Sequence, residues 1–188
     1  MYRRIVITGY KPHELGIFDP KHAGIRYIKK AIRKRLVSYI EDGLECEWII
    51  VSGQLGVELW TAEVVLELKE DYPHLKLAVL TPFLEQESKW QEEKQIQYRN
   101  LLAAADFVTS ITKRPYEGPW QFKAKNTFLL EHSDGLLAVY DEEKEGSPRY
   151  IVAEAKRRSE TGAYFYAAIS AYDLQMVVEE EQENEFGV

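Results

Sequence analysis

The chain has 188 residues, 45% hydrophobic and 29% charged, which is typical of a soluble globular protein and too short for two large domains. Its single cysteine excludes an internal disulfide, and no apolar stretch approaches the ~18 residues needed to cross a bilayer. The net charge is −7, but residues 179–188 hold five glutamates and no basic residue, so the remainder is close to neutral. A nucleic-acid partner is therefore disfavoured, because such proteins neutralise phosphates with a basic excess. The first residues lack the apolar core of a signal peptide, and we expect a cytoplasmic protein without a membrane partner.

Hydrophobic patterning predicts strands and helices in alternation along the chain. Short apolar runs predict strands at residues 4–8, 48–52, 75–80, 107–111, 136–140 and 163–169. Apolar positions three to four residues apart predict helices at residues 23–42, 57–72, 85–105, 120–132 and 148–158. Prolines and a glycine predict a loop at residues 112–119. The polar segment 85–105 either faces a second subunit of a homo-oligomer or is solvated.

This alternation predicts one α/β domain over residues 1–178, a Rossmann-like three-layer sandwich with a mostly parallel sheet. The acidic tail, residues 179–188, is expected to be disordered. Ligands of such sheets bind beyond the carboxyl ends of the strands. Candidate binding residues are therefore those that follow each strand: Thr8 and Gly9 after the first, the segment 52–58 after the second, and Thr81 after the third.

The sharpest of these signals is Ser52-Gly53-Gln54-Leu55-Gly56, which leads from a buried strand directly into a helix. Two glycines let the backbone turn tightly and bring its N–H groups close to an anion, and the helix start adds positive potential. A plain tight turn favours the same glycines. The spacing matches neither the dinucleotide fingerprint GxGxxG nor a Walker A loop.

Glu58 lies in the first turn of the predicted helix that follows. It either complements the helix dipole or accepts hydrogen bonds from ribose hydroxyls, and it is the candidate catalytic residue if a water is activated here. Gly146 and Ser147 form a second candidate anion site, with Ser147 as the N-cap and Pro148 as the first helical residue; capping alone also explains them.

The loop at residues 112–119 is a candidate lid. Arg114 can pair with a phosphate, and Tyr116 and Trp120 can stack on a base. Burial of the aromatic rings against the core is the alternative.

No metal site or catalytic machinery is visible in the sequence. The four histidines have no metal-ligand spacing, and the segment from Asp141 mimics a calcium loop only until Val152 fills its twelfth position. Cys46 is expected to pack rather than react.

Four segments resemble the YpsA-like family of bacterial proteins over nearly the whole chain: ITGYKPHELGIF, SGQLGVELW, TKRPYEGPWQFK and SDGLLAVYDEEKEGSP. That family is placed in the SLOG superfamily of Rossmann-like domains, with DprA and the LOG phosphoribohydrolases. The resemblance implies a nucleotide or nucleotide-sugar ligand, ADP-ribose or NAD-like, and a role in cell division, with a protein partner, or in a stress response. Ser52, Gly53, Gly56 and Glu58 match the superfamily's strand–loop–helix motif.

The LOG motif PGGxGT is not preserved, because Ser52, Gln54 and Val57 replace its proline, second glycine and threonine. We therefore expect a nucleotide-binding sensor or regulator without turnover. The alternatives are a nucleotide N-glycosidase that uses Glu58, and a DprA-like binder of single-stranded DNA.

Overall fold

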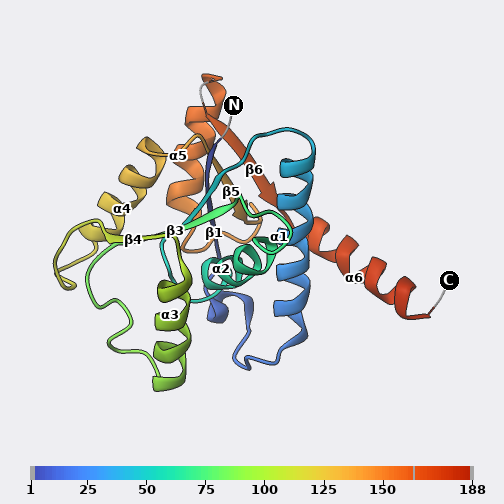
Figure 1. The fold of residues 1–188 in the computed structure, drawn as a ribbon, viewed down its shortest axis with the longest axis horizontal. Helices are drawn as coiled ribbons and strands as arrows, with labels where there is room; N and C mark the ends of the chain where they lie inside the picture. Colours follow the sequence, from blue (N-terminus) through green and yellow to red (C-terminus); the bar gives the residue numbers. More distant parts are fainter. Residues whose placement is uncertain (1–2, 163, 187–188) are drawn as a thin grey trace.

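The computed structural model describes residues 3–162 and 164–186, and it is an α/β protein built on one six-stranded parallel sheet in the order β4-β3-β2-β1-β5-β6 (Figure 1). The strands are β1 Arg4–Gly9, β2 Trp48–Val51, β3 Lys76–Thr81, β4 Phe107–Ser110, β5 Gly135–Val139 and β6 Phe165–Ile169. The helices are α1 Ala23–Glu41, α2 Val57–Leu68, α3 Glu92–Ala104, α4 Trp120–Glu131, α5 Arg149–Glu160 and α6 Ala171–Phe186, with a 3₁₀ turn, η1, at Pro12–Leu15. The single Rossmann-like domain predicted from the sequence is confirmed.

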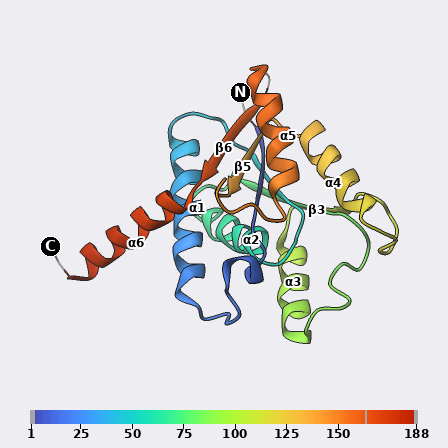
Figure 2. The same cartoon turned by 180° about the vertical axis from the view of Figure 1, so that it is seen from behind.

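Helices cover both faces of the sheet. Ile5 and Ile7 of β1 belong to the apolar cluster that includes α1, α2 and α3, whereas Val6 between them belongs to the cluster that includes α4 and α5. Successive side chains of a strand point to opposite faces, so strands such as β1, β2, β3 and β5 supply both clusters. Helices α4 and α5 lie side by side on their face (Figures 1 and 2).

The order of the strands brings three loops together. Strand β1 lies between β2 and β5, and all its partners are parallel, so the loops that follow β1, β2 and β5 leave the same edge of the sheet. Strands β2, β3 and β4 are added on one side of β1, and β5 and β6 on the other. The order of the strands therefore switches between β1 and β5, and open parallel sheets form their ligand crevices at such a switch point.

The helix predicted at residues 85–105 begins only at Glu92. Glu85 has a left-handed backbone, with φ of 55°, which interrupts a helix. The side chain of Gln86 turns inward and donates to the carbonyl oxygen of Ser52 at 3.0 Å and to the hydroxyl of Tyr98 at 2.8 Å. These bonds hold the segment in turns. The predicted strand at residues 163–169 is observed from Phe165, and Ala163 lies outside the described residues.

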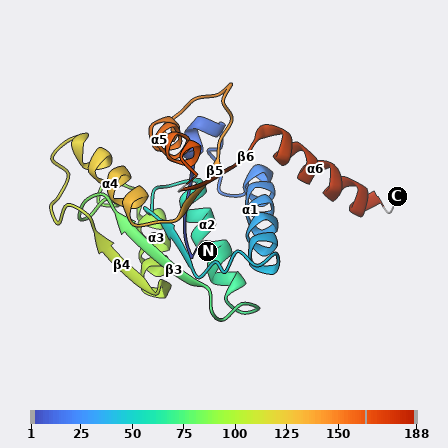
Figure 3. The ribbon, with the colours of Figure 1, turned by 90° about the horizontal axis from the view of Figure 1, so that it is seen from above.

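Residues 179–186 of the tail that we expected to be disordered are helical, since α6 continues to Phe186 and extends away from the sheet (Figures 1 and 3), and residues 187–188 lie outside the described residues. The acidic side chains of α6 lie against the basic face of α1. The ion pairs are Arg26–Glu181 at 3.6 Å, Lys34–Glu180 at 2.7 Å, Arg35–Asp173 at 3.6 Å and Lys30–Glu181. The acidic composition alone favours disorder. The basic residues that stabilise this helix lie on α1, which is far away in the sequence, so composition does not reveal them.

Candidate functional site

The loop between β2 and α2 forms the centre of the candidate site. Gly53 and Gly56 have φ values of 76° and 97°, in the region that favours glycine. A Cβ at Gly56 would lie 2.5 Å from the carbonyl oxygen of Tyr10, which also accepts the amide of Val57 at 3.2 Å. The glycine therefore lets the loop that follows β1 pack against the start of α2.

Glu58 fastens this loop from the first turn of α2. Its side chain is 3% exposed. Its Oε1 accepts the hydroxyl of Thr8 at 2.9 Å, and its Oε2 accepts the amide and hydroxyl of Ser52 at 2.8 and 2.6 Å and the amide of Gln54 at 3.2 Å. Both carboxylate oxygens are thus engaged by the chain itself. Of the roles considered for Glu58, the geometry supports positioning of the loop.

The start of α2 is left without a side-chain cap. The amide of Val57 donates to Tyr10, but the amides of Gly53, Leu55 and Gly56 have no acceptor within residues 3–162 and 164–186. Gly53 and Gly56 are buried, and Leu55 is half-buried. Buried backbone N–H groups in proteins nearly always have an acceptor, and the helix dipole favours a negative one here. This loop is therefore suited to bind an anion.

Lys125, on α4, is a functional candidate that the sequence analysis missed. Its side chain is 5% exposed, and it makes no hydrogen bond or ion pair with another described residue. Burial lowers the pKa of its amine, the carboxylate of Glu58 acts in the opposite direction, and the charge of Lys11 lowers it further. The buried positions Gln121, Lys125 and Leu129 are spaced by four residues, so helical periodicity could have identified an inward-facing lysine.

The second candidate anion site, at Gly146 and Ser147, is occupied by a carboxylate of the chain. Glu14 accepts the amide and hydroxyl of Ser147 at 2.6 and 2.8 Å and the amide of Lys11 at 2.7 Å. Burial raises the pKa of Glu14, but these hydrogen bonds outweigh it and hold the pKa below its usual value. The predicted capping is wrong: Pro148, rather than Ser147, is the N-cap residue of α5, and the hydroxyl of Ser147 donates to Glu14 instead of capping the helix.

A tyrosine completes the bridge between the loops after β1 and β5. The hydroxyl of Tyr10 donates to the carbonyl oxygen of Lys144 at 2.5 Å and accepts the amide of Asp141 at 2.9 Å. The loops after β1, β2 and β5 therefore converge, and the contacts of Tyr10 and Glu14 fill part of the switch point between β1 and β5.

The remaining predicted residues are Thr81, the last residue of β3, and Arg114 and Tyr116 in the loop after β4. The hydroxyl of Thr81 donates to the carbonyl oxygen of Phe83 at 3.2 Å. Arg114 pairs with Glu117 at 3.6 Å on the surface. The ring of Tyr116 packs against that of Phe83, with centroids 5.1 Å apart, and half of Tyr116 remains exposed. No described contact joins Arg114 or Tyr116 to the Glu58 network.

Gln121 fixes the 112–119 loop to α4. Its side-chain oxygen accepts the amides of Glu117 and Gly118 at 2.6 and 3.2 Å, and its nitrogen donates to Thr112 and Pro115 at 2.9 Å each. The predicted loop is thus ordered by a fully buried amide that stands one helical turn before Lys125.

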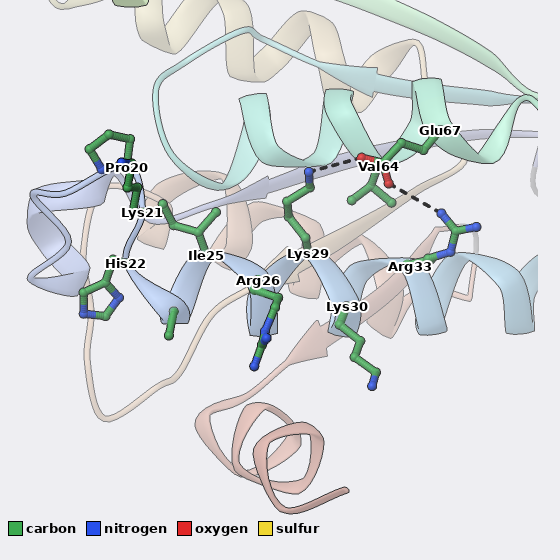
Figure 4. A pocket seen from close by; sticks show the side chains of 11 residues that line it. Pro20, Lys21, His22, Ile25, Arg26, Lys29, Lys30, Arg33, Val64 and Glu67 are labelled. Atoms are coloured by element: carbon green, nitrogen blue, oxygen red, sulfur yellow. Dashed lines mark hydrogen bonds and ion pairs between the residues drawn. The ribbon is translucent and has the colours of Figure 1, made fainter. Parts of the chain in front are cut away.

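A groove of about 740 Å³ lies elsewhere, between α1 and α2 (Figure 4). Its lining includes Lys29 and Arg33, which pair with Glu67 at 3.3 and 3.6 Å, and none of the predicted site residues lines it. The basic face of α1 therefore has carboxylate partners on α2 and α6.

Three further possibilities concern the described part of the chain: a metal site, a membrane-spanning helix and a reactive cysteine. No group of three or more His, Cys, Asp or Glu side chains there could hold a metal ion. No helix there combines the length and the apolar character that a bilayer span requires. Burial raises the pKa of the Cys46 thiol to about 12, which makes it a poor nucleophile.

Comparison with known proteins gives matches over nearly the whole chain. The family model YpsA, described as the YspA SLOG family, matches residues 5–174. A UPF0398 protein of Lysinibacillus sphaericus is 56% identical over 181 residues, which cover 96% of this chain and 100% of that protein. UPF0398 proteins of Bacillus cereus and Brevibacillus brevis are 59% and 53% identical over 180 and 183 residues, covering 96% and 97% of this chain and 97% and 96% of those proteins.

Proposed function

The chain belongs to the YspA SLOG family, and from this premise we propose that it binds a nucleotide or nucleotide sugar, such as ADP-ribose or NAD, at the carboxyl edge of its sheet. A phosphate of the ligand accepts hydrogen bonds from the open amides at the start of α2. The protein acts as a cytoplasmic sensor or regulator, with a protein partner in cell division or a stress response.

The observation that carries this proposal is the uncapped start of α2. Three amides there, of Gly53, Leu55 and Gly56, lack an acceptor among the described residues, while their neighbours Ser52 and Gln54 are bonded to Glu58. Since Glu58 holds the loop in one conformation, the open amides are ordered before a ligand binds. Preorganised amides bind an anion without a further ordering cost.

The contacts of Glu58 favour binding over turnover. An N-glycosidase needs a carboxylate with a free oxygen to activate water or to stabilise a cationic sugar. Both oxygens of Glu58 have partners on the protein. In the proposal, Arg114 and Tyr116 contact the far end of a bound nucleotide from the ordered 112–119 loop.

The proposal is tested by calorimetry with ADP-ribose, NAD, AMP and the phosphate-free control adenosine. A matched pair of variants probes the start of α2. Leu55→Glu places a carboxylate beside the open amides, and Leu55→Gln loses the same apolar contacts without the charge. We expect Leu55→Glu to bind at least ~10-fold more weakly than Leu55→Gln, since a competing carboxylate costs on the order of one charged hydrogen bond.

Two results would count against the proposal. Absence of heat for every phosphate-bearing ligand with the wild-type protein excludes the function. Equal affinities of the two Leu55 variants would remove the start of α2 from the binding site.

A further inference from the structure

Lys125 is a buried lysine whose amine makes no hydrogen bond and no ion pair within 4.0 Å among the described residues, although the carboxylate of Glu58 acts on it from a greater distance. Lysine is almost never fully buried unless its charge is paired, because moving an ammonium group out of water is costly. The contrast with α1 is direct: Lys29 and Arg33, at the surface groove, each have carboxylate partners within 4.0 Å, and Lys125 has none. The amine therefore has capacity for a direct hydrogen bond to an anion that the described chain does not provide.

The charges around Lys125 show where that anion would bind. Glu58 and Lys11 are the charged side chains that influence it. The four hydrogen bonds of Glu58 come from Thr8, Ser52 and Gln54, so its oxygens are committed to the loop. Lys11, which follows β1, has the same sign as Lys125. The neighbourhood therefore holds two amines and one carboxylate, and the carboxylate keeps its charge because its four hydrogen-bond donors are neutral.

The placement of Lys125 relative to α2 indicates the class of ligand. Helix α2 packs on one face of the sheet and α4 on the other, as their apolar clusters show. Glu58 belongs to the start of α2 and also acts electrostatically on Lys125. The open amides lie at the start of α2, and Lys125 lies one turn after Gln121, which holds the loop that follows β4, so both belong to the carboxyl edge of the sheet from opposite faces. Two adjacent negative groups on one ligand satisfy both, and a diphosphate has this form.

We propose that Lys125, assisted by Lys11, binds one phosphate of a diphosphate-containing ligand whose other phosphate lies at the start of α2. This inference rests on the proposed function and specifies its ligand class: nucleoside diphosphates and their sugar esters rather than monophosphates. The contact is a charge-assisted hydrogen bond in a site shielded from water, where such bonds are strongest.

Lys125→Met tests this assignment, because methionine has similar volume and no charge. Lys123→Met is the matched control, since Lys123 is exposed on the same helix. Removal of a buried unpaired charge is expected to raise the melting temperature by about 2–4 °C. The same change is expected to weaken binding of pyrophosphate and ADP-ribose by ~10–100-fold. Lys123→Met is expected to change neither property.

The ligands tested are inorganic phosphate, pyrophosphate, ADP-ribose, AMP and adenosine. Their binding is measured by thermal shift and by calorimetry. Tighter binding of pyrophosphate than of phosphate by the wild-type protein, lost in Lys125→Met, supports the inference. Undiminished binding by Lys125→Met overturns the role of Lys125 and leaves the proposed function standing. Absence of wild-type binding to every probe overturns both.

A structural role for Lys125 predicts a different result. In that case Lys125→Met and Lys125→Gln would both melt at lower temperature than the wild-type protein or fail to fold. Either outcome would show that the ammonium group supports the fold without a ligand, and the inference would be abandoned.

Discussion

Ser52 and Glu58 are six residues apart, and they are joined twice: the amide and the hydroxyl of Ser52 both donate to Oε2 of Glu58, at 2.8 and 2.6 Å. The pair closes the loop between β2 and α2 into a ring. The carboxylate occupies two amides that an external anion would otherwise reach, and it leaves the next ones open. Glu58 therefore determines which part of the loop is available to a ligand.

Glu58→Gln should destabilise the fold. A glutamine oxygen in place of Oε2 can still accept from Ser52 and Gln54, and its nitrogen can donate to the hydroxyl of Thr8, but hydrogen bonds to a charged carboxylate are then replaced by weaker neutral ones. We expect a loss of about 1–3 kcal/mol in the free energy of unfolding, measured with urea. Glu67→Gln, exposed on the same helix, serves as the control. Equal stability of the two variants would refute the positioning role of Glu58.

Gly56→Ala should be more destabilising than Gly43→Ala. Both glycines have positive φ, 97° and 82°, so both substitutions strain the backbone, by about 1–2 kcal/mol. Only at Gly56 does the added Cβ meet a backbone atom, the carbonyl oxygen of Tyr10 at 2.5 Å, whereas nothing lies within 4 Å at Gly43. Chemical denaturation compares the two. A smaller loss at Gly56 would mean that the loop after β1 does not pack as described.

Ligand binding should be accompanied by proton uptake. Burial lowers the pKa of Lys125 in the free protein, and a bound phosphate favours the protonated form, so binding raises that pKa. Affinity for pyrophosphate should therefore fall as the pH rises through the pKa of the free protein. Calorimetry in buffers of different ionisation enthalpy measures the protons taken up. Lys125→Met should show a smaller uptake, and an identical uptake would assign the proton to another group.

The amine of Lys125 also makes the stability of the folded protein depend on pH. The unfolded chain binds the Lys125 proton more tightly than the folded chain, because the folded-state pKa is lowered from 10.5. The stability of the ligand-free protein should thus be reduced below the folded-state pKa and recover as the pH approaches 10.5. Urea unfolding across this window, compared with Lys125→Met, isolates the contribution. A wild-type curve parallel to that of the variant would contradict it.

Helix α6 should loosen at high salt. Its polar half is held to α1 mainly by exposed ion pairs, such as Lys34–Glu180, and Val177 is its main buried apolar contact. Exposed ion pairs are screened by salt, so raising the salt concentration should speed hydrogen exchange in residues 178–186 more than in α1. Lys34→Gln should produce part of this effect at low salt. Unchanged exchange in both experiments would show that apolar contacts hold the helix.

Hydrophobic pattern and residue type were enough to predict the alternation of strands and helices, the single domain and the glycine loop from Ser52 to Gly56. These features depend on local properties: hydrophobic period, the conformational freedom of glycine and the proximity of a strand end to a helix start. The same local reasoning placed Glu58 in the first turn of α2. Its failure at residues 85–91 has a tertiary cause, because Gln86 is held by Ser52 and Tyr98 rather than by its own helix.

The hydrogen-bond and ion-pair partners of the polar side chains could be identified only from the folded structure. Thr8 lies 50 residues from Glu58, Glu14 lies 133 residues from Ser147, and α6 is docked by charges on α1. Lys125 emerges as unpaired only when every neighbouring carboxylate has been located. Hydrogen bonds and ion pairs act over a few ångströms in space regardless of separation along the chain. Which polar groups find a partner within the chain, and which do not, is therefore a property of the folded molecule.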